Sequence, residues 1–366
     1  RKMQENLVWA TGYNVFALGP AGTGRRDLVQ SLLEEQAAEE ETPPDWCYVN
    51  NFEEEREPRA ITLAAGQGME LKEDVEQLVE DLKTALPAAF ESEEYQARRE
   101  MVQEEVREDQ EEALEELQER AREDDIALIR TPQGFAFAPI QDGEVVSPEA
   151  VESMPEEERE AVQTRIEQYQ DELQRILRTV PQSQRQARQR IEELNRDMAN
   201  YAVRDLIDDV KAKYEENDAV VAFLDAIHDD LIDNVDIFVQ SAQTAQNGGQ
   251  ANPLAQMMQQ QGQGGPQGQG PGDALWRRYQ VNCVVDNGDT NGAPVVFEDN
   301  PKYQNLVGQV EQIAQMGALV TDFNLIRPGA LHEANGGYLV VEARKLLTQP
   351  YVWEGLKRAL ENEEIQ

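Results

Sequence analysis

The chain has 366 residues, of which 72 are acidic and 33 basic, so its formal net charge at pH 7 is −39. This length suits roughly two or three domains, and the acidic surface argues against nucleic acid or an anionic membrane as a partner, because both are bound through clustered Lys and Arg. Two histidines exclude a His-rich metal site, and no apolar run is long enough to span a bilayer. We expect a soluble, cytoplasmic protein. Its acidic surface suits a salt-rich cytoplasm, and the alternative is a mesophilic protein that is merely acidic.

A glycine-rich loop lies near the start of the chain. The apolar run at 13–18 (YNVFAL) predicts a strand, residues 19–25 (GPAGTGR) predict a loop, and residues 27–35 (DLVQSLLEE) predict an amphipathic helix. A strand, a glycine-rich loop and a helix in this order are typical of a P-loop, in which backbone amides and the helix N-terminus hold a phosphate. The sequence therefore predicts an anion-binding loop at this point.

The loop departs from the P-loop pattern G-x-x-x-x-G-K-[ST] at its last two positions. Gly19 and Gly24 match the two glycines, but Arg25 replaces the lysine and Arg26 replaces the hydroxyl residue that binds Mg²⁺. Arginine pairs with phosphate bidentately, so nucleotide binding survives the first change, whereas a guanidinium does not coordinate Mg²⁺. We predict a nucleotide loop with impaired hydrolysis; the alternative is a structural turn without a ligand.

Two strands and a helix are predicted next. Residues 45–52 (DWCYVNNF) and 58–63 (PRAITL) are short apolar runs that predict buried strands. Apolar residues then recur at helical spacing as far as Pro87, where we expect the helix to end. Together with the glycine-rich loop, these segments form the first part of an α/β core, residues 1–90.

The middle of the chain, residues 91–240, is predicted to be an antiparallel helical arm, with a small β excursion near 126–146. Two sets of apolar residues are spaced 4-3-4-3, which is the seam of a coiled coil, and Pro181 separates the sets. A simple pair of long, solvated helices is structurally equivalent. The seams consist of Val162, Ile166, Tyr169, Leu173 and Ile176, and of Ala187, Ile191, Leu194, Met198 and Tyr201.

The last third of the chain returns to short strands and helices. Residues 241–272 are rich in Gln and Gly and predict a flexible linker, and residues 273–366 form the second part of the core. Glu342 ends the apolar run 338–341, the position of a Walker B acid, but Ala343 stands where a water-polarising acid would follow. The simpler interpretation is that Glu342 is the first polar residue after a buried strand.

No catalytic site is complete within these residues. No serine lies in G-x-S-x-G, and no pair of carboxylates stands out among so many. His332 lies beside a glycine-rich turn, and we interpret it as a loop-packing residue. Cys47 and Cys283 lie far apart in apolar runs, and we interpret them as small buried residues rather than a disulfide or metal pair.

Five segments in this order resemble the AAA+ part of Lon-like proteases: GYNVFALGPAGTGR, DWCYVNNF, PVVFEDNPKYQNLVGQVE, IRPGALHEANGGYLVVEARKLL and WEGLKRALENEEI. The resemblance is to the bacterial branch with a long helical insert and altered Walker motifs. It implies a P-loop AAA+ core, a parallel sheet flanked by helices, with an inserted coiled-coil arm. The residues that match the nucleotide site are Gly19, Gly22, Thr23, Gly24, Arg25 and Arg26 in the Walker A loop, and Glu342 as the Walker B acid.

The resemblance also implies a function. It suggests a homo-oligomeric, hexameric ring that admits unfolded or damaged protein to a Ser–Lys peptidase domain beyond Gln366, with ATP or ADP as the cofactor and a doubtful Mg²⁺ site. The chain would then be part of a serine endopeptidase whose catalytic residues lie outside this fragment. The alternatives are a non-catalytic AAA+ scaffold that binds a protein partner through its arm, and an ATPase remodeller without a protease.

Overall fold

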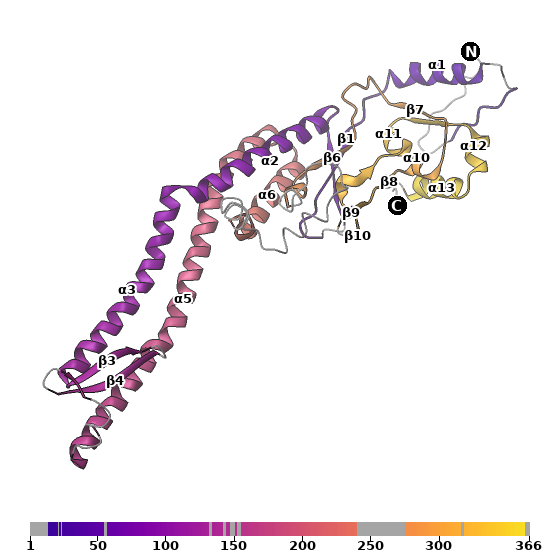
Figure 1. Ribbon diagram of the computed structural model, residues 1–366. Coiled ribbons are helices and arrows are strands. Elements are labelled where there is room, and N and C mark those ends of the chain that lie inside the picture. Colours follow the sequence, from indigo (N-terminus) through magenta and orange to yellow (C-terminus); the bar gives the residue numbers. More distant parts are fainter. Residues whose placement is uncertain are drawn as a thin grey trace. The chain divides into compact units, whose positions relative to one another are not determined.

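The computed structural model describes residues 14–362, apart from 21, 23, 55–56, 132–133, 142–143, 147–150, 152–154, 240–274 and 316–317. The chain divides into two compact units (Figure 1). The first comprises Arg1–Asp81, Leu206–Ile227 and Ala251–Gln366, and the second comprises Leu82–Asp205 and His228–Gln250. Thr23 and the predicted linker 241–272 lie outside the described residues. Within the described part of the chain, no helix is both long enough and apolar enough to cross a membrane.

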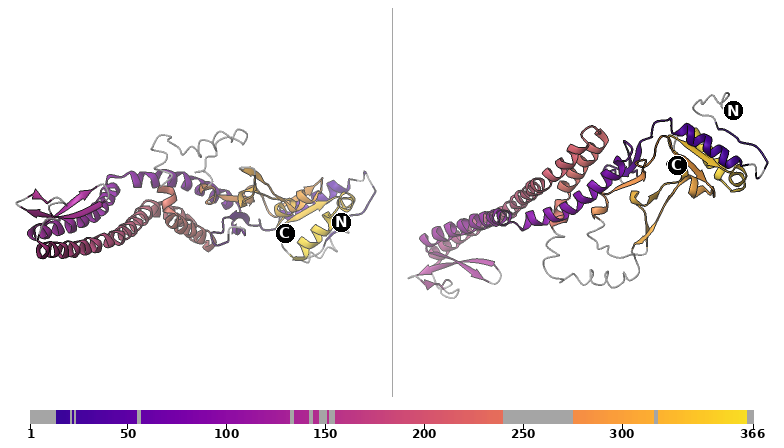
Figure 2. Two further views of the ribbon diagram at one scale, coloured as in Figure 1. Left: turned by 60° about the horizontal axis from the view of Figure 1, so that its bottom comes forward. Right: turned by 90° about the horizontal axis from the view of Figure 1, so that it is seen from above.

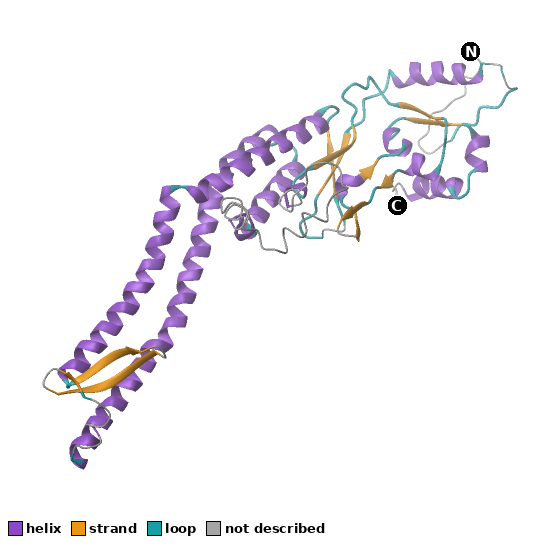
Figure 3. Cartoon of the chain, in the orientation of Figure 1, coloured by secondary structure: helices purple, strands orange, loops and turns teal. Residues whose placement is uncertain are grey.

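The first unit mixes helices with short strands (Figure 3). It contains α1 (Arg25–Ala37), β1 (Asp45–Val49), β2 (Arg59–Leu63), the start of α2 (Gln67–Glu91), the end of α5 (Glu156–Lys213), most of α6 (Asp218–Asp233), β6 (Val281–Val285), β7 (Val295–Glu298), α10 (Tyr303–Val307), β8 (Gln309–Val310), β9 (Ile313–Gln315), β10 (Ala318–Val320), η1 (Phe323–Leu325), β11 (Ile326–Arg327), α11 (Ala330–Glu333), β12 (Tyr338–Val341), α12 (Ala343–Thr348) and α13 (Val352–Asn362). The strands pair mostly as small sheets of two or three.

β1 is the central strand of an antiparallel sheet with the order β2-β1-β6. Strand alternation buries Asp45, Cys47 and Val49 on one face. The buried Asp45 carboxylate accepts hydrogen bonds from the backbone N–H of Gly68 (2.8 Å), at the start of α2, and from that of Asn287 (2.7 Å), after β6. Because a buried carboxylate needs such donors, Asp45 fixes both flanking segments to β1.

The parallel sheet expected for the core is not found around β1. The connection from β1 to β2 is shorter than the crossover that parallel neighbours require, so these strands form a hairpin. Among the described residues, parallel pairing occurs only between β7 and β12, with Tyr338 opposite Val295.

The prediction of a strand before the glycine-rich loop is also wrong. Residues 14–18 have no regular secondary structure, and the side chains of Val15, Phe16 and Leu18 are exposed. None of the described strands pairs with this run, and an apolar sequence does not form a strand without a partner for its backbone N–H and C=O groups.

One face of the β7–β12 pair carries the apolar core of this part of the first unit. Because side chains alternate along a strand, Val296, Leu339 and Val341 all point to that face. Helices α10, α11, α12 and α13 cover it with Leu306, Val307, Ala330, Leu346, Val352 and Leu356.

The second unit is built on two long antiparallel helices, α3 (Glu93–Glu123) and α5, which Figures 1 and 2 show side by side. It also contains the end of α2, β3 (Ile126–Thr131), β4 (Gly134–Gln141), β5 (Glu144–Val145) and the end of α6. Glu105 pairs with Arg190 at 2.7 Å, and Arg120 pairs with Glu172 at 2.8 Å. As the residue number rises along α3, the residue number of the ion-pair partner in α5 falls, so the two helices run in opposite directions.

An apolar cluster joins α3 and α5 to the antiparallel sheet β3-β4-β5. Its buried members are Leu117, Ala121, Ile126, Phe137, Tyr169 and Leu173. The Tyr169 hydroxyl donates a hydrogen bond to Asp124 at 2.7 Å. Burial, together with this hydrogen bond, raises the pKa of Tyr169 to about 12.

A buried polar network lies farther along the same helices. The Tyr95 hydroxyl donates to Oδ1 of Asn195 at 2.8 Å, and Nδ2 of Asn195 donates to Asp236 at 3.0 Å. The Tyr95 ring also makes an edge contact with Phe90, at a centroid distance of 5.1 Å. Each buried polar atom named here has a partner, so the network fixes the register of α3 against α5.

Three expectations about these helices are wrong. Helix α2 continues through Pro87, and α5 continues through Pro181. Proline has no backbone N–H, so it removes one helical hydrogen bond. At Pro181 the carbonyl left without a donor is that of Leu177. Leu177 is exposed, so water can hydrogen-bond to this carbonyl instead. Tyr201 is 82% exposed because the buried face of α5 has moved to Ala199. A straight helix drifts from a heptad spacing in this way.

Candidate functional site at the glycine-rich loop

The glycine-rich loop leads directly into α1. Gly22 and Gly24 have φ angles of 80° and 69°, in the left-handed region that favours glycine. Gly24 is the N-cap residue of α1, and among the described residues no side chain caps this helix end. The first backbone N–H groups of α1 therefore remain available, and a helix N-terminus in this state attracts anions.

An ion pair holds the first turn of α1 against the end of β7. The Arg26 guanidinium makes two hydrogen bonds to the Asp299 carboxylate, at 2.6 and 3.0 Å. It also lies over the ring of Phe297, 5.3 Å from the centroid. The hydrogen bonds from Arg26 lower the pKa of Asp299 below its ordinary value.

Two contacts hold the other end of α1 to the face of the β7–β12 pair that carries Phe297, the face opposite the apolar core. The backbone N–H of Ala293 donates to the carbonyl of Ala37 at 2.9 Å, and the Tyr338 hydroxyl donates to Glu40 at 2.6 Å. Gly292 has a φ of 81°, and a Cβ there would lie 2.0 Å from the Ala37 oxygen. Helix α1 therefore lies opposite the apolar core, with its N-terminus at the carboxyl ends of β7 and β12.

A chain of opposite charges links the loop to the end of β12. Lys345 donates to the backbone carbonyl of Asp299 at 2.9 Å and pairs with the Glu342 carboxylate at 3.3 Å. Glu342 is exposed and is the N-cap residue of α12. In open α/β sheets, ligands bind outside the carboxyl ends of the strands, which is where these charges gather.

The structure brings most of the predicted site residues to this edge. Gly22, Gly24, Arg25 and Arg26 lie at the start of α1, and the charge chain connects them to Glu342. Their binding of a nucleotide stays a prediction, and Gly19 lies just upstream of them.

Sequence reasoning missed Asp299 and Lys345. The argument applied to Glu342, that an acid follows an apolar run, points in β7 to Glu298, the residue just before Asp299, and so does not single out Asp299. Lys345 carried no such signal, since its role depends on Asp299 and Glu342 being close in space.

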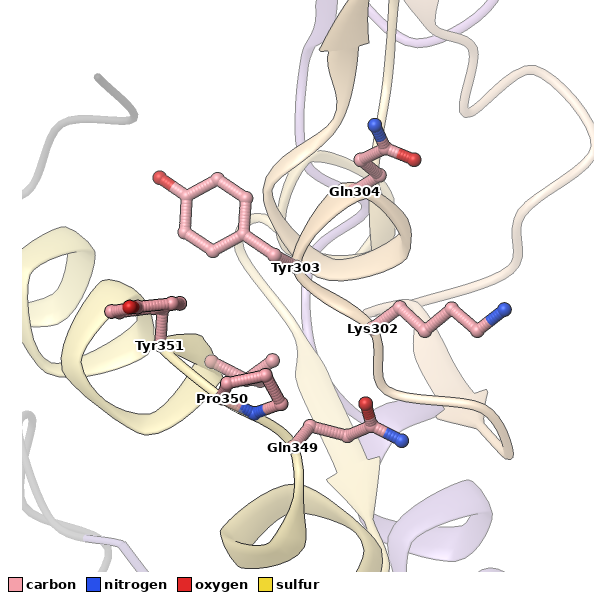
Figure 4. A pocket seen from close by; sticks show the side chains of 7 residues that line it. Lys302, Tyr303, Gln304, Gln349, Pro350 and Tyr351 are labelled. Atoms are coloured by element: carbon pink, nitrogen blue, oxygen red, sulfur yellow. The ribbon is translucent and has the colours of Figure 1, made fainter.

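A second feature of the first unit is an open hollow of about 490 Å³ (Figure 4). The rings of Tyr303, from α10, and Tyr351, just before α13, both border it. The other lining residues are Lys302, Gln304, Gln349, Pro350 and Val352. Neither a carboxylate nor a histidine is among these lining residues.

The described residues contain no candidate metal cluster, and one of the two histidines is held within a loop. Nowhere in this part of the chain do three or more His, Cys, Asp or Glu residues gather so that they could hold a metal ion. Nδ1 of His332 accepts a hydrogen bond from the backbone N–H of Gly329 at 3.1 Å, and burial lowers the pKa of His332. This contact fits the interpretation of His332 as a loop-packing residue.

Comparisons with known families agree on one relationship. Residues 291–366 match a family model described as a LonB-like AAA domain, and residues 45–78 match one described as the Lon-like LonC helical domain. A comparison with curated proteins found no match. The two family matches support a Lon-like family, and the AAA match, which includes β7, β12, Asp299 and Glu342, supports a Lon-family AAA+ module.

Proposed function

We propose that this chain is the AAA+ module of a Lon-like protease whose nucleotide loop binds ATP or ADP weakly and hardly hydrolyses it. The observation that carries the proposal is the bidentate Arg26–Asp299 pair at the start of α1. It places a cation where the P-loop pattern requires a Mg²⁺-binding hydroxyl.

Phosphate binding is supported by the loop. Glycines at positive φ bring the backbone close to an anion without steric hindrance, and nothing lies within 4 Å of where a Cβ of Gly22 would be. The exposed Arg25 adds a bidentate donor next to the uncapped start of α1. The residues present therefore fit a nucleotide phosphate.

Efficient hydrolysis is not supported by the same residues. The Arg26 guanidinium occupies the hydroxyl position, and its positive charge opposes a divalent cation there. The carboxylate of Glu342 is paired with Lys345, and Ala343 offers no acid to polarise water. We therefore infer that the residues fit a nucleotide phosphate but not the Mg²⁺ that an efficient ATPase holds.

The larger assembly is proposed on the family resemblance. On this view residues 1–90 and 273–366 form the AAA+ core around the helical insert 91–240, and six copies form a cytoplasmic ring. The ring admits unfolded or damaged protein to a Ser–Lys peptidase domain. The alternative is a non-catalytic scaffold that binds a protein partner through the helical insert, which the exposed, charged α3–α5 pair also permits.

The nucleotide proposal is tested by titrating the chain with a fluorescent ATP analogue, with and without Mg²⁺. We expect a Kd of roughly 0.1–1 mM, unchanged by EDTA. Arg25→Ala should weaken binding by about ten- to a hundredfold, because a charge-assisted hydrogen bond contributes about 1.5–3 kcal/mol. Arg98→Ala, which removes an exposed arginine in the second unit, is the matched control and should bind normally.

Two results would contradict the proposal. Equal binding by the Arg25→Ala and Arg98→Ala variants, or no binding at all, would favour a structural turn without a ligand. Steady-state turnover near about one per second, abolished by Glu342→Gln, would show an active ATPase. Degradation of an unfolded protein substrate by the protein as encoded separates the protease from the scaffold, because a scaffold leaves the substrate intact.

A further inference from the structure

The two cysteines of the chain lie opposite each other in the β2-β1-β6 sheet. Cys47 in β1 and Cys283 in β6 are directly paired residues of antiparallel strands, although they are far apart in the sequence. Cys47 is buried, as expected, whereas Cys283 is only partly buried, and the sequence did not predict that the two are neighbours. Both are free thiols in this structure.

The geometry of the pair suits a disulfide. Directly opposed residues in antiparallel strands have Cα atoms about 4.5–5.5 Å apart, within the range of about 4.4–6.8 Å that a disulfide requires. The Cys47 thiol donates a hydrogen bond to the carbonyl of Gly68 at 3.8 Å, and the Cys283 thiol donates to the carbonyl of Val285 at 3.4 Å. A Cβ at Gly68 would lie 3.0 Å from Sγ of Cys283, so the glycine at the start of α2 leaves the space that the sulfur occupies.

The two thiols differ in accessibility and in acidity. Cys47 is 1% exposed, whereas Cys283 is only partly buried. The neighbouring Cys47 thiol lowers the pKa of Cys283, and the neighbouring Cys283 thiol together with burial raises the pKa of Cys47. Cys283 is therefore the thiol that reacts first with a reagent in solution, because the thiolate is the nucleophile.

We propose that Cys47 and Cys283 are a redox-active dithiol that low-molecular-weight disulfides oxidise to an intramolecular disulfide between β1 and β6. The Cys283 thiolate attacks a disulfide RSSR, so that a Cys283–SR mixed disulfide forms and one RS⁻ leaves and takes up a proton. Cys47 then loses its proton and attacks the Cys283 sulfur, so that the bond to SR breaks and the second RSH is released. Overall, two protein thiols and RSSR give one protein disulfide and two RSH.

The disulfide would bridge the chain on either side of the whole helical region. β1 precedes α2, α3, α5 and α6 in the sequence, and β6 follows them. A covalent bond between β1 and β6 therefore closes a very long loop, and disulfides that close long loops constrain the unfolded chain most. Oxidation would hold this sheet together even after the chain is cut within the loop.

The test treats the folded, reduced chain with glutathione disulfide, traps free thiols with N-ethylmaleimide and measures the intact mass. We expect a product lighter by two hydrogen atoms, without N-ethylmaleimide, and a disulfide-linked peptide pair containing Cys47 and Cys283. After limited trypsin cleavage between β1 and β6, the flanking fragments should stay joined on a non-reducing gel and separate when reduced.

Single variants distinguish the steps. Cys47→Ser should stop at a stable glutathione adduct on Cys283, and Cys283→Ser should leave Cys47 unmodified because it is buried. Circular dichroism verifies that both variants remain folded. Cys283→Ala is a second variant in case serine disturbs the sheet. The proposal is overturned if the native protein keeps two free thiols, if it accumulates the adduct without the internal disulfide, or if Cys47 reacts first.

Discussion

Replacing Leu117 with alanine should weaken the second unit more than any surface change on the same helix. The Leu117 side chain is fully buried in the cluster that joins α3 and α5 to β3 and β4. Leucine-to-alanine changes in cores cost about 2–5 kcal/mol, depending on how far the cavity collapses. Phe137 and Tyr169, at the rim of this cluster, are each 9% exposed, so partial collapse is easy, and we expect about 3 kcal/mol.

The assay is unfolding in increasing urea concentrations, with hydrogen exchange as the readout for peptides from α3 and from β1. With a urea dependence of about 1–3 kcal/mol per M, the midpoint of the α3 peptides should fall by about 1–3 M. Met101→Ala, a change on the same helix at a side chain that is 68% exposed, is the control and should cost less than about 0.5 kcal/mol. Equal midpoints for the two variants would refute the assignment of Leu117 to a core, and an equal shift of the β1 peptides would show that the two units unfold together.

Three further outcomes are expected. Tyr95→Phe removes the donor to the buried Oδ1 of Asn195 and should cost about 1–3 kcal/mol by urea unfolding, whereas Tyr201→Phe, at an exposed ring, should cost little. The pKa of Tyr169 is about 12 in the folded chain and about 10 in the unfolded chain. Its contribution to stability is therefore complete below about pH 10 and is lost as the pH rises to about 12. Tyr169→Phe should reduce this loss, as measured by thermal unfolding between about pH 9 and pH 12. A net charge of −39 makes the exposed acidic side chains repel one another, and salt screens this repulsion. The melting temperature should therefore rise between low salt and about 1 M KCl, where the Debye length is about 3 Å. An unchanged or lower melting temperature would show that this repulsion does not limit stability.

Local patterns predicted the helices well and their interruptions badly. Helical spacing of apolar residues is a property of neighbouring turns, so most of the α5 seam that includes Leu173 packs as expected. Pro87 and Pro181 were expected to end helices because sequence alone does not show that tertiary packing stabilises the helix on both sides of a proline.

Features that depend on strand register were not predictable. The apolar run 13–18 predicts a strand, but a strand requires a partner that the local sequence does not specify, and residues 14–18 form none. The pairing of Cys47 with Cys283 and the contact of Arg26 with Asp299 join distant parts of the chain. The glycines at positive φ, by contrast, were visible as part of a motif, which is why the loop itself could be located in advance.

The pairing of β1 with β6 also bears on how the protein is synthesised. Asp45 and Asn287, which join the two strands, lie 242 residues apart. At about 5–20 residues per second, a ribosome needs roughly 10–50 s to produce the chain between them. The helices form contacts over shorter separations, such as the 100 residues between Tyr95 and Asn195, and can fold earlier. Until β6 has been synthesised, one edge of β1 has unpaired backbone groups, and such an unpaired edge is a site at which chains can aggregate during biogenesis.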